Sequence, residues 1–382
     1  MFERELSELR KKDLLRGLMA LESRQGPVVT IRGKRYINFA SNDYLGLACH
    51  PEVVRAAEAA GRRFGFGAGA SRLLAGGNTL HEKLEDMVAF FKKTEAALVF
   101  NSGYAANTGL LPALAAGDAV IFSDELNHAS IIDGCRLSNA AVRIYRHRDM
   151  GHLAELMKRE PKRRKIVATD GVFSMDGDIA PLPDIYSLCL KHGAALWLDD
   201  AHATGVLGDG SGSLSHFGLE PGPWTVQMGT FSKALGSFGA FVAGSSDIVD
   251  WALNSARSFM FSTALPSPVV AASIKALSLV VKRPGMRKRL RSNTLKACEG
   301  LRGIGCDVVP GETPIIPLRQ RTVRQALALS SYLWDSGIYA PAIRPPTVRE
   351  PRVRITVTAA HTERHIRLLV EAIRKYGKRT ER

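Results

Sequence analysis

The central part of the chain alternates short apolar runs with longer stretches of mixed polarity. Four largely apolar runs are residues 96–100, 119–122, 165–170 and 194–198. Apolar runs of this length are typical of strands buried within a sheet. Strand-like and helix-like runs alternate between residues 46 and 275, which predicts an α/β fold with a mostly parallel sheet wrapped by helices.

The two ends of the chain have different patterns. An amphipathic helix and a small strand pair are predicted within residues 1–45. From residue 276 a helix-rich basic stretch is followed by further strand-like runs and a final helix, which predicts a small α+β domain. We therefore divide the chain into an N-terminal segment, residues 1–45, a large α/β domain, residues 46–275, and a small C-terminal domain, residues 276–382.

Polar residues follow the apolar run at 194–198. Asp199 comes directly after it, and His202 lies three positions further on. In open α/β sheets, functional groups gather just beyond the carboxyl ends of parallel strands. Taken singly, the two residues are more simply explained as a helix-capping aspartate and a hydrogen-bonded core histidine.

A lysine is placed in an unusual setting in the segment Gly229–Gly236. Lys233 lies between small and hydroxylic residues with a glycine at each end, and Thr230 precedes it by three positions. Its amine could form a Schiff base with a carbonyl compound if its pKa is lowered. An ordinary glycine-rich loop is the alternative. Combined with Asp199 and His202, however, Lys233 matches what pyridoxal 5′-phosphate requires, namely an amine for its aldehyde and a carboxylate for its ring nitrogen.

Two further predicted strand ends carry candidate residues. The run at 96–100 is followed by Ser102, Gly103 and Tyr104 and then by a helix-like segment. This order predicts a phosphate site at a helix N-terminus. His128 follows the run at 119–122 and could lie against a planar ring, although a surface histidine is the simpler alternative. Ser174 lies in the turn-rich loop after the run at 165–170.

These motifs resemble those of the α-oxoamine synthases, which are fold-type I pyridoxal-phosphate enzymes. The resemblance extends from about residue 41 to about residue 356. Its longest signatures are Asp124–Gly134, Leu198–Gly205 and Ala342–Thr347. It implies a fold-type I transferase with a smaller α+β C-terminal domain, pyridoxal 5′-phosphate as cofactor, and a homodimer.

The resemblance also implies roles for single residues. Lys233 would hold the cofactor and act as base, Asp199 would bind its ring nitrogen, and His128 would stack on its ring. Ser174 and His202 would bind the phenolic oxygen of the cofactor. The phosphate and pocket contacts would come from Ser102, Gly103, Tyr104 and Thr230, and from Ser262 and Thr263 of the neighbouring subunit.

Substrate contacts follow from the same resemblance. Arg344 would bind the amino-acid carboxylate, which suits a planar guanidinium, with Asn42 and Thr347 beside it. Arg16 corresponds to an arginine that meets the far carboxylate of the acyl chain, although a solvated helix charge is the alternative. Ser71 stands where glycine-specific relatives carry Thr, which leaves room for the methyl group of L-alanine.

The implied reaction is a decarboxylative condensation of an amino acid with an acyl thioester. The branch most similar to this chain joins L-alanine to a pimeloyl group, carried by CoA or acyl carrier protein, in biotin biosynthesis. Glycine C-acetyltransferase shares several of the same stretches and is the alternative. A catalytically dead partner subunit is the alternative of another class, but Lys233, Asp199, His128 and His202 are all present.

Composition agrees with an intracellular enzyme. The chain has 382 residues, of which 45% are hydrophobic, which is sufficient for a large core and more than one domain. Its five cysteines are scattered without metal-site spacing, so we expect free or buried thiols and no metal. The charged N-terminus lacks the apolar core of a secretory signal, and no apolar run approaches the ~20 residues that cross a bilayer. We therefore expect a soluble, cytoplasmic protein without a membrane partner.

The formal net charge of +15 raises the question of a nucleic-acid partner. Basic runs at residues 158–165 and 287–291 could bind phosphate backbones. No aromatic platform, zinc knuckle or recognition-helix motif accompanies them. We interpret them as solvated surface and expect no nucleic-acid partner. A positive potential can still draw in a polyanionic acyl-CoA.

Overall fold

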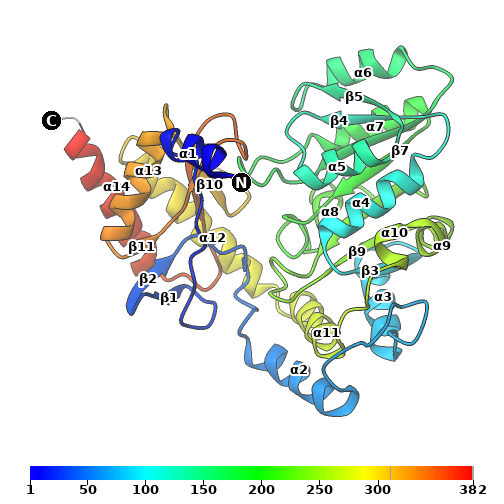
Figure 1. Ribbon diagram of the computed structural model, residues 1–382, viewed down its shortest axis with the longest axis horizontal. Helices are drawn as coiled ribbons and strands as arrows, with labels where there is room; N and C mark the ends of the chain where they lie inside the picture. Colours follow the sequence, from blue (N-terminus) through cyan, green and yellow to red (C-terminus); the bar gives the residue numbers. More distant parts are fainter. Residues whose placement is uncertain (310, 381–382) are drawn as a thin grey trace. The chain divides into compact units, whose positions relative to one another are not determined.

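The computed structural model describes residues 1–309 and 311–380 (Figure 1). These residues form two compact units. One unit, called the sheet unit below, comprises His50–Ser174 and Asp178–Pro284. The other, called the terminal unit, comprises Met1–Cys49, Met175–Gly177 and Gly285–Arg382, of which residues 310, 381 and 382 lie outside the description.

The sheet unit is built on one seven-stranded sheet. In spatial order its strands are β3 (Ala96–Phe100), β9 (Ala240–Gly244), β8 (Thr225–Thr230), β7 (Ala194–Asp199), β6 (Arg164–Asp170), β4 (Ala119–Asp124) and β5 (Ala141–Tyr145). β9 pairs antiparallel with both of its neighbours, whereas the pairs from β8 to β5 are all parallel. The predicted mostly parallel sheet is therefore confirmed.

Successive strand residues enter two different hydrophobic clusters. In β7, Trp197 packs into one cluster, and Leu196 and Leu198 pack into the other. In β4, Ile121 and Val120 divide in the same way. Because side chains alternate between the two faces of a strand, these clusters lie on opposite faces of the sheet. Burial of both faces explains the nearly continuous apolar runs in the sequence.

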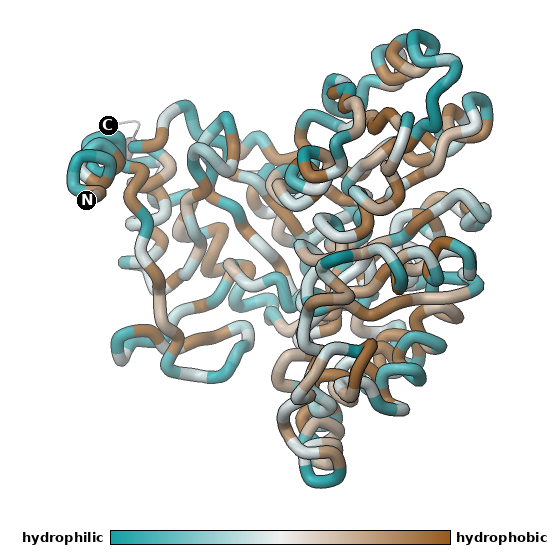
Figure 2. The backbone as a smooth tube through the Cα atoms, turned by 45° about the vertical axis from the view of Figure 1, so that its right-hand side comes forward, coloured by the Kyte–Doolittle hydropathy of each residue, from teal (hydrophilic) through white to brown (hydrophobic). Residues whose placement is uncertain are grey.

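Helices cover both faces of this sheet. The cluster that contains Trp197 includes residues of α4 (Gly103–Leu114), α5 (Ala129–Leu137), α9 (Ser246–Ser255) and α10 (Arg257–Met260). The opposite cluster includes residues of α6 (Met150–Lys158), α7 (Leu182–His192) and α8 (Ser213–His216). Of three further helices, α11 (Ser267–Lys282) packs against both α2 (Pro51–Phe64) and α3 (Thr79–Lys92). Brown, hydrophobic stretches alternate with teal, hydrophilic ones along the backbone tube (Figure 2).

The described residues of the terminal unit form two small sheets and four helices. One sheet has the order β1 (Val28–Ile31), β2 (Lys34–Asn38), β11 (Ile338–Tyr339), and the other has the order β10 (Ile315–Arg319), β13 (Arg352–Thr356), β12 (Ala342–Ile343). The helices are α1 (Glu3–Lys11), α12 (Gly285–Arg302), α13 (Val323–Asp335) and α14 (Glu363–Thr380). Apolar residues of α12, α13, α14 and both sheets share one core. This is the α+β domain predicted for the C-terminal part, with strands of the N-terminal segment joined to it.

A histidine links two loops at the edge of the seven-stranded sheet. His147 Nδ1 lies 2.9 Å from Asp124 Oδ1, and its Nε2 lies 2.7 Å from Asp178 Oδ2. Burial alone would lower the pKa of His147, but the two carboxylates outweigh burial and raise the pKa to about 9. His147 is therefore an imidazolium at neutral pH, and it holds Asp178 against the end of β4.

This arrangement predicts a pH-dependent loss of stability. A raised pKa in the folded state stabilises it fully below the unfolded value of about 6.5, and this contribution is lost as the pH rises through about 9. We expect His147→Gln to lower the free energy of unfolding by about 1–3 kcal/mol near pH 6 and by much less above pH 10. Urea unfolding across this range measures the difference. Equal losses at both ends would show that the charge of His147 contributes nothing.

Candidate active site

Polar residues collect at the carboxyl ends of four neighbouring strands. β7 ends at Asp199, β6 at Asp170, β4 at Asp124 and β8 at Thr230. Asp170 and Asp199 are paired in the strand register, so their side chains start from adjacent positions. Lys233 follows three residues after Thr230. The parallel order of β8, β7, β6 and β4 therefore brings together residues that lie far apart in the sequence.

Asp199 is buried, and both of its oxygens accept hydrogen bonds. Oδ1 accepts from the backbone N–H of Ala201 at 3.0 Å, and Oδ2 accepts from Asn107 Nδ2 at 2.8 Å. Only 3% of the residue is exposed. Because both bonds favour an ionised carboxylate, Asp199 is suited to hold a positively charged ring nitrogen.

Asp170 stands beside Asp199 under different conditions. Burial and, after it, the charge of Asp199 raise the pKa of Asp170 well above the usual range. Its Oδ2 accepts the backbone N–H of His128 at 2.7 Å. The carboxyl group that binds the backbone of His128 is therefore one whose burial disfavours ionisation.

His128 is brought into electrostatic contact with both Asp199 and Lys233. Desolvation of its imidazole lowers the pKa of His128, the charge of Asp199 opposes this shift, and that of Lys233 adds to it. The residue caps α5 and remains exposed as a whole. A neutral imidazole on this exposed residue, beside Asp199 and Lys233, is available to contact a planar ring. His202 is buried, and Ser174 is half-buried.

The N-terminus of α4 meets the end of β8. Ser102 caps this helix, and its Oγ accepts the N–H of Ala105 at 3.1 Å. A Cβ placed on Gly103 would lie 3.0 Å from Thr230 Cγ2, so the two residues are in contact. The Thr230 hydroxyl oxygen is buried and has no hydrogen-bond partner among the described residues. A helix N-terminus beside an unsatisfied hydroxyl is suited to a phosphate.

Several other predicted contacts lie in the sheet unit. Ser71 and Thr263 face each other in an isolated antiparallel bridge, and Asn101 Nδ2 donates to the carbonyl of Thr263 at 2.8 Å. Ser262 is half-buried. Tyr104 is exposed and donates its hydroxyl to Asp133, a bond that raises the pKa of Tyr104. The roles proposed for these side chains stay predictions.

A second group of predicted residues gathers within the terminal unit. Arg16 Nη2 donates to Thr347 Oγ1 at 3.0 Å and lies 3.4 Å from the carbonyl oxygens of Arg344 and Pro345. Arg344 Nη2 donates to the carbonyl of Leu15 at 2.7 Å, and its Nε is buried without a partner among the described residues. Asn42 Oδ1 instead accepts from Arg354, at 3.1 Å. Arg16, Arg344 and Thr347 are therefore brought together, and their roles in substrate binding stay predictions.

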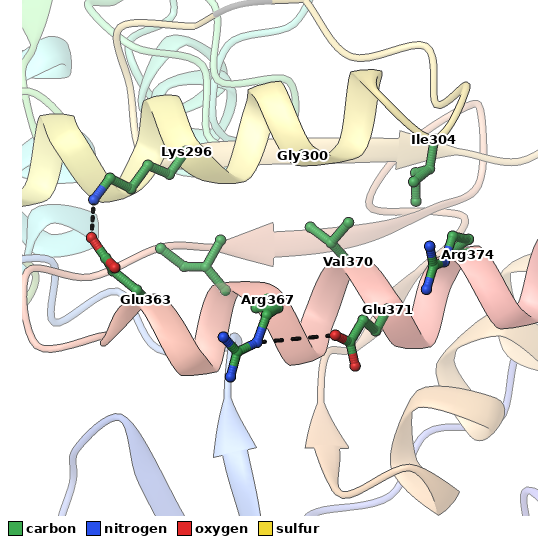
Figure 3. A pocket seen from close by; sticks show the side chains of 9 residues that line it. Lys296, Gly300, Ile304, Glu363, Arg367, Val370, Glu371 and Arg374 are labelled. Atoms are coloured by element: carbon green, nitrogen blue, oxygen red, sulfur yellow. Dashed lines mark hydrogen bonds and ion pairs between the residues drawn. The ribbon is translucent and has the colours of Figure 1, made fainter.

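A hollow of the terminal unit lies elsewhere, between α12 and α14. It has a volume of about 480 Å³ and is lined by Lys296, Gly300, Glu363 and Val370, among others (Figure 3). Lys296 pairs with Glu363, and Arg367 lies 4.0 Å from Glu371. Because Lys296 pairs with Glu363 across the hollow and Arg367 pairs with Glu371 along α14, these charges are already compensated, and we assign the hollow no role.

Two other features are absent from the described residues. Within residues 1–309 and 311–380, no group of three or more His, Cys, Asp or Glu side chains could hold a metal ion. No helix in that part of the chain is both long and apolar enough to cross a membrane.

Sequence reasoning missed several residues of this site. Asn107, Ser130 and Asp170 all contact predicted site residues. Asn107 gave a usable signal, since it is a polar residue within the apolar face of a helix-like run. Asp170 ends an apolar strand just as Asp199 does. The position of Ser130 gave no signal, because a serine in the first turn of a helix is common.

The fold is that of a pyridoxal-phosphate enzyme of fold type I. The sequence pattern of the family "Aminotransferase class I and II" matches residues 34–373. The chain is 52% identical to a protein of Thermodesulfovibrio yellowstonii that is provisionally named an 8-amino-7-oxononanoate synthase, over 97% of this chain and 96% of the relative. It is 47% identical to the 8-amino-7-oxononanoate synthase of Thermoanaerobacter pseudethanolicus, over 98% and 95%. The chain therefore belongs to the class I and II aminotransferase family, in its 8-amino-7-oxononanoate synthase branch.

Solved structures agree with this assignment. A serine palmitoyltransferase variant from S. paucimobilis, with pyridoxal phosphate and myriocin bound, is 30% identical and superposes with a TM-score of 0.93 over 99% of this chain and 97% of that one. An 8-amino-7-oxononanoate synthase from Francisella tularensis is 27% identical, with a TM-score of 0.79 over 91% and 99%. The predicted family and fold are confirmed, and pyridoxal 5′-phosphate is the cofactor. The unsatisfied Thr230 hydroxyl, the α4 N-terminus and the Asp199 carboxylate fit its phosphate and its ring nitrogen.

The unsatisfied hydroxyl leads to a test of the phosphate site. We expect Thr230→Val to weaken pyridoxal-phosphate binding about 10- to 100-fold, because a charge-assisted hydrogen bond is lost. The apoprotein should keep its melting temperature, since the hydroxyl has no partner among the described residues. Equilibrium titration of the apoprotein with the cofactor measures the affinity.

The same strand offers a matched control. The hydroxyl of Thr225, the first residue of β8, is also buried and also lacks a partner among the described residues. Thr225→Val makes the same chemical change at the opposite end of the strand and should leave cofactor affinity unchanged. If the two variants lose affinity equally, Thr230 does not bind the phosphate.

Proposed function

We propose that the chain catalyses the decarboxylative condensation of L-alanine with a pimeloyl thioester. The products would be 8-amino-7-oxononanoate, CO2 and the free acyl carrier. The observation that carries this proposal is identity of 52% and 47%, over nearly the full chain, to relatives with that name. The site supports the same reaction, since Lys233, Asp199 and His128 lie close enough to influence one another electrostatically.

The cofactor, when bound, supplies an aldehyde that reacts with amines and a ring that accepts the electrons of the broken Cα–H bond. Lys233 Nζ would provide the amine and take the Cα proton. Asp199 would keep a proton on the ring nitrogen, and the imidazole of His128 would contact the ring. Ser174 and His202 would bind the phenolic oxygen, a role for which the buried position of His202 is suitable. Thr230 and the helix N-terminus at Ser102 and Gly103 would bind the phosphate.

The arginine group of the terminal unit supports carboxylate binding. Arg16 and Arg344 each contact neutral oxygens, namely backbone carbonyls and the Thr347 hydroxyl, which leave their positive charges uncompensated by those contacts. The Nε–H of Arg344 is a buried donor without a partner among the described residues. We assign the amino-acid carboxylate to Arg344 and the far carboxylate of the pimeloyl group to Arg16. Asn42, which accepts from Arg354, is the weaker candidate.

A substrate matrix tests the proposed reaction. L-alanine, glycine and L-serine are each combined with pimeloyl-CoA, pimeloyl-acyl carrier protein, acetyl-CoA and palmitoyl-CoA, and products are identified by mass spectrometry. We expect 8-amino-7-oxononanoate from L-alanine and a pimeloyl donor, with glycine disfavoured about 10- to 200-fold in kcat/KM because one methyl group is worth about 1–3 kcal/mol. Lys233→Ala is the inactive control. Turnover confined to glycine and acetyl-CoA would refute the proposal in favour of a glycine C-acetyltransferase.

Exposed apolar residues indicate a surface for a second copy of the chain. Phe66, Leu74 and Phe261 have 80%, 80% and 69% of their surface exposed. The bridge between Ser71 and Thr263 joins the segment that carries Phe66 and Leu74 to the segment that carries Phe261. Clustered exposed side chains of this kind mark interaction sites, and twofold dimers are the commonest oligomers. We propose a homodimer in which Ser262 and Thr263 reach the phosphate of the neighbouring site.

Mixed dimers test this arrangement. One chain carries Lys233→Ala, and the other carries Ser262→Ala and Thr263→Val. If the segment crosses the interface, one site of the mixed dimer has both defects and the other has neither, so activity should return to about half of one wild-type dimer. Absence of recovery after verified subunit exchange would place both contacts within one chain. Each parental dimer serves as a control.

The proposal also includes a cytoplasmic location. All five cysteines are free thiols, and burial raises the pKa of Cys135 to about 11 and that of Cys189 to about 12. Thiols with raised pKa values react slowly at neutral pH. Free thiols are also the usual state of cysteines in a reducing compartment.

A further inference from the structure

A buried amide connects two predicted cofactor-binding residues. Asn107 lies in α4 and is completely buried. Its Nδ2 lies 2.8 Å from Asp199 Oδ2 and 2.8 Å from Ser130 Oγ, and its Oδ1 lies 3.0 Å from Trp197 Nε1. All three polar contacts of this side chain are hydrogen bonds to other buried side chains. If one member of such a network can only donate, the direction of every other hydrogen bond in the network follows from it.

Trp197 is that member. Its indole N–H cannot accept a hydrogen bond, so the atom of Asn107 that faces it must be the carbonyl oxygen. Both hydrogens of the amide nitrogen therefore point to Asp199 and Ser130. Because Asp199 Oδ2 receives a hydrogen from the amide, this oxygen carries no proton of its own along that bond.

The same reasoning continues to His128. Ser130 Oγ accepts from Asn107 and lies 2.7 Å from His128 Nδ1, so its own hydrogen is directed to that nitrogen. The backbone N–H of Ser130 points to the same atom at 3.3 Å. With two donors facing it, His128 Nδ1 is an acceptor. The imidazole proton is then on Nε2, and the lowered pKa of His128 agrees with a neutral ring.

We propose that Asn107 is a positioning residue that sets the protonation states of Asp199 and His128 together. It holds Asp199 as an oriented carboxylate and, through Ser130, holds His128 as the neutral tautomer with its proton on Nε2. This inference rests on the cofactor site within the proposed function. An aspartate at position 107 could serve neither purpose, because it cannot donate two hydrogen bonds and would put a second carboxyl group against Asp199.

The first test is Asn107→Asp, read out in the apoprotein. Histidine-selective 15N NMR reports the tautomer of each ring, and His128→Gln identifies the His128 signal. In the wild-type apoprotein we expect Nδ1 of His128 to be unprotonated. In Asn107→Asp the Ser130 hydroxyl turns to the new carboxyl group, so His128 should shift towards a mixture of tautomers. Cofactor affinity, measured by titration, should fall at least about tenfold.

Asn293→Asp provides a matched control. Asn293 is a buried asparagine of α12 whose Nδ2 donates to the carbonyls of Thr358 and His361, at 3.0 and 2.8 Å. Replacement of Asn293 by aspartate removes the two hydrogen bonds that its amide donates, in a buried site of the terminal unit. We expect a comparable loss of melting temperature without a change in the His128 tautomer.

Trp197→Phe is the second variant, and it decides the question if Asn107→Asp does not fold. It removes only the donor that fixes the orientation of the Asn107 amide. The Asn107 amide can then rotate by about 180°. The His128 tautomer and the cofactor affinity should therefore change in the same direction as in Asn107→Asp, but by a smaller amount. If the folded variants at positions 107 and 197 melt earlier but retain the wild-type tautomer and cofactor affinity, Asn107 only fills space. The tautomer is read without substrate, so an unexpected product in the substrate matrix would leave this result intact.

Discussion

Buried carboxyl groups at one edge of the sheet impose the constraint on which the rest of the site depends. Asp124, Asp170, Asp199 and Asp200 are all at most 4% exposed and lie at neighbouring strand ends. Buried charges are expensive unless they are paired and hydrogen-bonded. Most of the polar contacts around the site offset this cost, because each carboxyl group is hydrogen-bonded or ion-paired to a different group.

The partners divide the carboxyl groups by function. Asp200 pairs with Lys92 Nζ at 2.8 Å, and neither side chain is exposed. Lys92 also donates to the carbonyl of Ser211 at 2.5 Å. Lys92 therefore compensates the charge of Asp200, the residue that follows Asp199 in the sequence. Asp199 itself meets an amide and a backbone N–H, neither of which carries charge, so its negative charge is left to act on a ligand.

Many features of this site could be anticipated from the sequence. Asp199, His128 and Thr230 follow or end apolar runs, and the carboxyl ends of parallel strands lie at one edge by geometry. The partners of these residues could not be anticipated. Asn107 reaches Asp199 across 92 positions of sequence, and only the packing of α4 on β7 brings the two together. Contacts of this range have no local pattern, because helical and strand periodicities describe which face a residue occupies and not what it meets there.

The sequence by itself determined the alternation of strands and helices, the family signatures and the residue types needed for the cofactor. It did so because strand burial and turn chemistry are written in neighbouring residues. Only the tertiary structure decided the strand order, with β9 reversed between β3 and β8, and the packing of the N-terminal strands with the C-terminal part in one unit. It also decided which amide, hydroxyl or amine satisfies each buried carboxylate. These choices depend on long-range packing, where many pairings bury similar apolar area and the pairing of buried polar groups selects among them.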